Sequence, residues 1–253
     1  MSNLLSANLC SYGGVSDEAM AHLAALGVHH LEIGAPAPDG VEALRERMAR
    51  FGLSAATLTT GSPIAHEDAA ERFAPVAEAA RALGASAIFI SVRAGDLPRE
   101  TAYARLRAMG DVAAANGVSI AMETHPDLCA NGDQMLETMA AVDHPAVGIN
   151  FDTANIYYYN AGADTVAEVR KAAKFVRAVH LKDSIGELES FNFPTLGQGI
   201  VDFPGVFAAL AEVGFRGPYT MELEGVAGQP GTFEQRAQQV TDSVAYLRAN
   251  GLV

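Results

Sequence analysis

Eight short apolar runs, each followed by a longer amphipathic segment, repeat along this chain from one end to the other. Such runs suit buried β-strands, and the segments between them have the length and periodicity of helices. The predicted strands are Leu4–Leu9, Val28–Ile33, Leu53–Leu58, Ala87–Val92, Ser119–Glu123, Val147–Asp152, Val176–Lys182 and Tyr219–Leu223. The predicted helices are Asp17–Leu26, Val41–Phe51, Glu67–Leu83, Arg99–Asn116, Gly132–Val142, Thr165–Phe175, Pro204–Val213 and Phe233–Asn250. This repetition predicts βαβ units and a parallel sheet.

The residues that flank the predicted helices agree with this assignment. Gly84 and Gly117 each follow a helix, where a left-handed C-cap is expected. Ser16 and Asp202 each precede a helix, where their side chains can cap its N-terminus. The fold class is therefore predicted to be α/β, with residues 1–253 forming a single (β/α)8 or TIM barrel domain.

An open doubly wound sheet is the alternative arrangement of the same units. Its usual marker, GxGxxG after the first strand, is missing, because Gly13 and Gly14 after Tyr12 do not match it. The barrel is favoured for this reason. In a barrel the one long connection, residues 184–201, lies at the C-terminal face, where loops carry function.

The charge of the chain excludes some partners. The formal net charge is −13, with 17 basic residues scattered among 30 acidic ones, whereas nucleic-acid binding needs clustered lysine and arginine. The N-terminus has no basic segment followed by an apolar run, and no apolar stretch is long enough to span a membrane. We therefore expect a cytoplasmic protein with no nucleic-acid or membrane partner. Cys10 and Cys129 are expected to be buried free thiols.

Four polar side chains lie at the ends of the last four predicted strands. Glu123 ends SIAMETH, Asp152 ends the run in VGINFDTAN, His180 lies in VRAVHLKDS and Glu222 in PYTMELEG. A lone acid at a strand end is usually a solvated loop residue or a helix cap. Four such groups on consecutive strands would instead meet at the mouth of a barrel.

Three carboxylates and one imidazole repel or desolvate one another when they are crowded into a pocket. A divalent cation removes that conflict. This donor set suits Mn²⁺ best, while Mg²⁺, Co²⁺, Zn²⁺ and Fe²⁺ remain alternatives. Glu224, two residues after Glu222, is the rival for the last ligand position.

Several motifs resemble the xylose isomerase-like TIM barrel family of sugar phosphate isomerases and epimerases. They are METHPD, NFDTAN, VHLKDS and LGQGIVDFPGVFAALAEVGFRGPYTMELE, and the resemblance covers nearly the whole chain. It implies that Glu123, Asp152, His180 and Glu222 are ligands of one divalent metal ion. It also implies that Glu123 and Glu222 are the catalytic acid–base pair of a sugar, ketose or polyol isomerase or epimerase.

The expected chemistry is proton transfer at a carbon beside a carbonyl. A metal bound to adjacent substrate oxygens stabilises an enediolate, so that a carboxylate can remove the proton. Return of the proton to the other face gives epimerisation, and its return to the neighbouring carbon gives isomerisation.

Further residues near the strand ends are candidates for substrate binding. His125 and Lys182 follow Glu123 and His180 on the same side of an extended chain. The remaining candidates are Asn155, Glu32 and Arg93. Asn155 replaces a histidine found in other family members, which weakens assignment to the ketose 3-epimerases. The tyrosines at 157–159 either wall the pocket or form a subunit contact, so a homo-oligomer stays open.

Other functional classes remain as alternatives. A lyase or dehydratase acting on an inosose or a 3-keto sugar would use the same metal and need an acid for the leaving group, with His125 as the candidate. A non-catalytic metal-binding barrel would not need both Glu123 and Glu222. The related abasic-site endonucleases need extra ligands, and residues 184–201 contain no Asp-x-His. The Gly197–Gly199 segment lacks a basic residue and does not by itself indicate a phosphate site.

Overall fold

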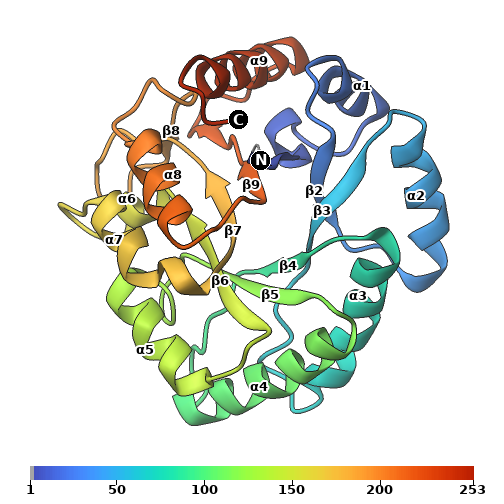
Figure 1. The fold of residues 1–253 in the computed structure, drawn as a ribbon, viewed down its shortest axis with the longest axis vertical. Helices are drawn as coiled ribbons and strands as arrows, with labels where there is room; N and C mark the ends of the chain where they lie inside the picture. The colour runs from blue at the N-terminus through green and yellow to red at the C-terminus, as the bar shows by residue number, and fades with distance from the viewer. Residues whose placement is uncertain (1–2) are drawn as a thin grey trace.

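The computed structural model describes residues 3–253, in which eight parallel strands form a closed barrel inside a ring of helices (Figure 1). The barrel strands are β1 (Leu5–Asn8), β2 (His30–Gly34), β3 (Ser54–Thr59), β4 (Ala87–Ile90), β5 (Ser119–Glu123), β6 (Val147–Asp152), β7 (Val176–Leu181) and β9 (Tyr219–Met221). The predicted α/β class and TIM barrel architecture are confirmed.

The helices follow the strands in the predicted alternation. The α-helices are α1 (Asp17–Ala25), α2 (Val41–Ala49), α3 (Ala69–Leu83), α4 (Arg99–Ala115), α5 (Gly132–Val142), α6 (Asn155–Tyr159), α7 (Thr165–Ala172), α8 (Phe203–Glu212) and α9 (Phe233–Ala249). The last helix lies beside the first, where Arg248 donates to the carbonyl of Leu26 at 2.7 Å (Figure 1). This contact between distant parts of the sequence helps to close the ring.

The structure also contains short elements that the sequence pattern did not predict. They are the 3₁₀ turns η1 (Leu9–Tyr12) and η2 (Pro38–Gly40), helix α6, and the antiparallel pair β8 (Asn192–Phe193) and β10 (Gly225–Val226). A third 3₁₀ turn, η3 (Ala173–Phe175), forms the last turn of the predicted helix Thr165–Phe175. Strands of two residues and single helical turns are too short to show a hydrophobic period. The pair β8–β10 belongs to loops after β7 and β9, so it shapes the functional face.

The predicted helix ends are found where local chemistry requires them. The Ser16 side chain accepts from the amide of Ala19 at 3.0 Å, and the Asp202 side chain accepts from Gly205 at 2.9 Å. These bonds satisfy amides that have no partner within the helix. Gly84 ends α3 with a φ of 76°, a left-handed conformation that suits glycine.

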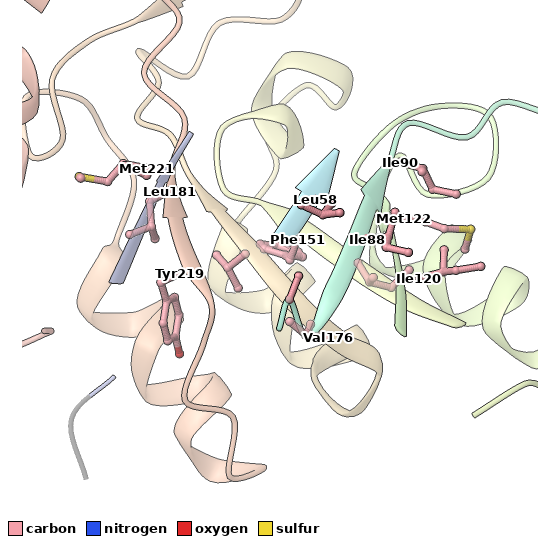
Figure 2. Packing of buried hydrophobic residues seen from close by; sticks show 14 of the residues in the cluster. Leu58, Ile88, Ile90, Ile120, Met122, Phe151, Val176, Leu181, Tyr219 and Met221 are labelled. Atoms are coloured by element: carbon pink, nitrogen blue, oxygen red, sulfur yellow. The ribbon is translucent and has the colours of Figure 1, made fainter. Parts of the chain in front are cut away.

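The outward faces of the strands carry the large apolar side chains. Tyr219 of β9 stacks on Phe207 of α8, with ring centroids 4.0 Å apart. Burial of this kind between sheet and helix layer is the main favourable term in folding. Figure 2 shows such side chains from β3 to β9, labelled Leu58, Ile88, Ile90, Ile120, Met122, Phe151, Val176, Leu181, Tyr219 and Met221.

The inward faces of the same strands carry mainly small and polar side chains, and Phe89 of β4 is a large apolar exception. Paired residues in adjacent parallel strands project to the same side, and the register pairs Asp152 with His180 and Asn8 with Glu32. Glu32 is likewise paired with Thr57. The barrel interior is therefore polar towards its C-terminal mouth.

Two expectations concern features outside the barrel interior. Cys129 is a buried free thiol, as predicted, but Cys10 is exposed. That prediction was wrong for Cys10 because the chain leaves the strand as η1 before reaching it. Within residues 3–253, every helix is too short or too polar to cross a membrane.

Candidate metal centre and substrate cavity

Four side chains meet at the C-terminal mouth of the barrel. Glu123 and Asp152 are the last residues of β5 and β6, and His180 lies one residue before the end of β7. Glu222 directly follows β9. Each of these four residues offers a ligand atom, and the four atoms all lie within 4.8 Å of one another. This buried group could hold a divalent metal ion.

The turn after β6 fixes the orientation of Asp152. Its Oδ1 accepts from the backbone amides of Ala154 and Asn155, both at 2.9 Å. The Asn155 side chain donates to Glu123 Oε1 at 3.3 Å and to the Thr124 carbonyl at 3.2 Å. Helix α6 therefore begins where it can hold one oxygen of Asp152 and leave Oδ2 facing the group.

Three buried atoms in this group, Asp152 Oδ2, His180 Nδ1 and Glu222 Oε2, make only ion-pair contacts among the described residues. Buried carboxylate oxygens that converge with an imidazole nitrogen repel one another unless positive charge lies between them, so they are suited to hold a cation. His180 Nδ1 lies 3.1 Å from Glu222 Oε2 and 3.9 Å from Asp152 Oδ2. Carboxylate oxygens and one imidazole nitrogen fit a divalent cation.

Lys182 brings a positive charge to the same place. Its side chain is 2% exposed, and Nζ lies 2.9 Å from Asp152 Oδ2 and 2.6 Å from Glu222 Oε2. A third carboxylate oxygen, Glu224 Oε2, is 2.7 Å away. An ammonium surrounded by three acids partly neutralises a cluster that would otherwise repel itself.

Glu123 and Glu222 experience opposite electrostatic environments. Burial, reinforced by the charge of Glu222, raises the pKa of Glu123 to about 7. Burial also disfavours ionised Glu222, but the positive charges of His180 and Lys182 outweigh it and lower the Glu222 pKa well below its ordinary value. The two acids thus differ in proton affinity although they line one cavity.

His125 belongs to a hydrogen-bonded row at the rim. Arg93 Nη2 lies 2.8 Å from His125 Nδ1, and the Tyr159 hydroxyl lies 2.9 Å from His125 Nε2. Burial and the neighbouring Arg93 charge lower the pKa of His125. Arg93 itself is exposed and acts on the rim through His125.

Glu32 does not reach the cavity. It is fully buried, and its carboxylate accepts from Asn8 at 2.9 Å and from Thr57 at 2.7 Å. Its remaining contact is His180 Nε2 at 2.9 Å. The expected position facing substrate is therefore wrong, because Glu32 ends below the mouth and points across the barrel at His180.

The long connection after β7 is organised by Asp183. This buried carboxylate accepts from the backbone amides of Gly197 and Gly199, both at 2.8 Å, and from Val201 at 3.2 Å. A Cβ atom at Gly199 would lie 2.3 Å from Asp183 Oδ1, so only glycine permits this approach. The Gly197–Gly199 segment thus binds a carboxylate of its own chain.

A cavity of about 350 Å³ opens above the four-residue group. It brings together Glu123, Glu222 and three of the predicted substrate residues, namely His125, Asn155 and Lys182. The other lining residues are Phe89, Ser91, Tyr158, Tyr159, Phe191, Phe193 and Glu224. The sequence pattern did not single out Ser91, which donates to Glu123 Oε2, or the three phenylalanines.

The model of the xylose isomerase-like TIM barrel family matches residues 20–250 of the chain. The chain belongs to this family. The predicted resemblance is confirmed, since the match includes seven of the eight barrel strands, all but β1.

Individual members of the xylose isomerase-like family differ in their reactions. An inosose dehydratase of Geobacillus thermodenitrificans is 22% identical over 247 residues, which cover 82% of each chain. An L-ribulose 3-epimerase of Methylomonas sp. is 29% identical over 189 residues, covering 69% of this chain and 63% of that protein. The structure of D-psicose 3-epimerase from Clostridium cellulolyticum H10, with D-tagatose, has a TM-score of 0.78 at 15% identity and covers 97% and 98% of the two chains. The last likeness supports the fold alone.

Proposed function

We propose that this protein is a metal-dependent isomerase or epimerase of a ketose or polyol, working by carboxylate-mediated proton transfer. The observation that carries this proposal is the placement of Glu123 and Glu222, which line one cavity and belong to one candidate metal-binding group. Strands β6 and β7 separate β5 from β9 in the barrel. A small substrate in this cavity would therefore have both carboxylates within reach.

Glu123, Asp152, His180 and Glu222 would hold one divalent ion, for which we propose Mn²⁺. When bound, the ion polarises a substrate carbonyl and stabilises the charge that develops as a proton leaves the adjacent carbon. The convergence of one ligand atom from each of these four buried residues supports this assignment. The oxygen-rich donor set favours Mn²⁺ among the divalent ions of this chemistry.

The two glutamates move the proton. One removes it from the carbon beside the carbonyl, and the other returns a proton to the opposite face or to the neighbouring carbon. Asn155 holds Glu123 through its Oε1, and Ser91 donates to Oε2, so the carboxylate is fixed in orientation. A carboxylate that is already oriented towards the reacting carbon lowers the entropic part of the activation barrier.

The remaining cavity residues bind and enclose the substrate. Lys182 and Glu224 present an ammonium and a carboxylate for substrate hydroxyls, and Asn155 presents an amide. Phe191 and Phe193 contact each other with ring centroids 4.9 Å apart. Aromatic rings of this kind pack against the C–H face of a sugar ring and exclude water.

A lyase that removes a β-substituent is the second candidate. The observation that favours it is the pair His125 and Tyr159, which are hydrogen-bonded to each other and both line the cavity. Either could protonate a leaving hydroxyl after the α proton has been removed. The similarity to inosose dehydratase agrees with this candidate.

The deciding experiment is solvent-deuterium exchange followed by NMR. Mn²⁺-loaded protein is incubated in D₂O with ketoses, inososes and 3-keto glycosides, then freed of metal before spectra are recorded. We expect deuterium at the carbon beside the carbonyl and an isomeric product that keeps every hydroxyl. Glu222→Gln serves as the control for exchange catalysed by free metal.

Two outcomes would contradict the leading proposal. If the substrate loses water or an aglycone while deuterium enters at the carbon beside the carbonyl, the protein is a lyase and not an isomerase or epimerase. Absence of exchange across the panel, in protein shown to bind one equivalent of metal, would remove the proton-transfer class altogether.

A further inference from the structure

We propose that Glu32 is a positioning residue for the metal centre, which fixes His180 so that Nδ1 faces the cation. This inference rests on the proposed metal site and is independent of the substrate and of the reaction. Glu32 comes from β2, whereas His180 comes from β7, and β1 and β9 lie between these strands in the barrel. The contact therefore crosses the barrel interior.

The two nitrogens of His180 face different partners. Nε2 lies 2.9 Å from Glu32 Oε1, whereas Nδ1 is the atom directed at Glu222 and Asp152. The Phe89 ring packs on the imidazole with centroids 4.6 Å apart and restricts its tilt. Only Nδ1 is thus available to the group of carboxylates.

Glu32 is itself held rigidly. Thr57 Oγ1 donates to Oε2 at 2.7 Å, and Asn8 Nδ2 donates to Oε1 at 2.9 Å. With the contact to His180, this fully buried carboxylate has three hydrogen-bonding neighbours from three other strands. A side chain bound in this way cannot turn towards the cavity, so its function is exerted through His180.

The chemistry of imidazole makes this contact consequential. A neutral imidazole has one N–H and one lone pair, and an acceptor at one nitrogen places the proton there. Glu32 already takes hydrogen bonds from Asn8 and Thr57, and as an acceptor for His180 it selects the tautomer with the proton on Nε2. The lone pair on Nδ1 is then free for a metal ion, as in the carboxylate–histidine–metal arrangement.

Glu32→Gln tests the proposal with little change in volume. The amide can donate to Nε2, which would favour the tautomer with the proton on Nδ1 and block the ligand atom. We expect Mn²⁺ affinity, measured by calorimetric titration, to fall by about 10–100-fold. Thr138→Val is the matched control, because Thr138 is also buried and donates to a carbonyl, that of Leu128, away from the site.

A double variant separates positioning from a general loss of stability. In His180→Asn the imidazole is gone, so adding Glu32→Gln should weaken Mn²⁺ binding much less than it does in the wild type. An equal additional loss in both backgrounds would mean that Glu32 acts by another route. If Glu32→Gln does not fold, Thr57→Val removes one anchor of the carboxylate and should give a smaller loss in the same direction.

NMR of the Zn²⁺-loaded protein gives a readout independent of activity. Long-range ¹H–¹⁵N spectra should show metal at His180 Nδ1 and a proton at Nε2. Metal at Nε2, or a Glu32→Gln variant with wild-type Mn²⁺ affinity, would overturn the proposal for Glu32. Failure of the wild type to bind any divalent ion would instead overturn the proposed metal site.

Discussion

Strands β5, β6 and β7 and the end of β9 each supply one member of the candidate metal-binding group, whereas β1 to β4 supply none. The first half of the barrel nevertheless sends polar side chains to the same place. Asn8, Glu32 and Thr57 form a network that ends on His180, and Ser91 after β4 donates to Glu123. One half thus offers the ligand atoms, and the other half contributes hydrogen bonds to two of the four residues, His180 and Glu123.

The difference follows from the geometry of a closed barrel. Neighbouring strands bring their ends together directly, so four consecutive strand ends can share one ion. A side chain from the opposite side of the barrel has to cross the interior. It then contacts a ligand residue on the atom that faces away from the ion, as Glu32 contacts His180 Nε2. Asymmetric chemistry can therefore arise on a backbone that repeats the same unit.

The largest expected effect is at Glu222, in the half that supplies the ligands. Glu222→Gln should abolish measurable turnover and weaken metal retention, because an amide is a poorer ligand and no base. Metal content after gel filtration, measured by atomic emission, checks the second point. Glu224→Gln is the matched control, because Glu224 contacts Lys182 but is outside the four-residue group, so its metal content should stay near wild type. Equal metal loss in both variants would show that Glu224 shares the ligand position.

Glu123→Gln should have the next largest effect. At saturating Mn²⁺ the variant should regain occupancy but lose about 10²–10⁴-fold in kcat, the usual contribution of a positioned acid or base. Rate measurements across a Mn²⁺ titration separate this loss from weak metal binding. Near wild-type kcat at full occupancy would reduce Glu123 to a structural ligand.

The repeated architecture was predictable because its signals are local and periodic. The strand Ser119–Glu123 and the helix Gly132–Val142 have the predicted bounds, because a short apolar run defines the first and an amphipathic segment defines the second. The convergence of Glu123 and Glu222 was predictable for a related reason. Both stand at the end of an apolar run, and the barrel then determines where such ends meet.

Other parts of the site depend on contacts that no local pattern contains. Glu32 also ends an apolar run, but its partner His180 is 148 residues away, so its direction could not be read from β2 alone. Phe191 and Phe193 lie in a loop without periodicity, and they reach the cavity because β8 pairs with β10. Long-range pairing of short segments leaves little trace in sequence.

Ser91→Ala tests the supporting half with a smaller expected effect. Loss of the hydroxyl removes a donor from Glu123 Oε2 and frees the carboxylate to rotate. We expect kcat to fall by about tenfold, equivalent to about 1.4 kcal/mol in the barrier, while Mn²⁺ affinity changes little. Ser86→Ala is the control at the opposite end of β4, where the hydroxyl donates to the Ala56 carbonyl at 3.2 Å. A loss of Mn²⁺ affinity in Ser91→Ala as large as that in Glu222→Gln would show that the first half of the barrel also contributes directly to metal binding.

The smallest expected effect on catalysis concerns Asp183, which belongs to the ligand-bearing half but has a purely structural set of contacts. Asp183→Asn weakens the charged acceptor of the Gly197, Gly199 and Val201 amides, so the connection that carries Phe191 and Phe193 should loosen. We expect the free energy of unfolding to fall by about 1.5–3 kcal/mol and KM to rise, with kcat at saturating substrate and Mn²⁺ affinity largely retained. Asp202→Asn is the control, because asparagine caps a helix about as well as aspartate does. Loss of kcat without a rise in KM would give Asp183 a direct part in the chemistry and would add a fourth essential acid to Glu123, Asp152 and Glu222.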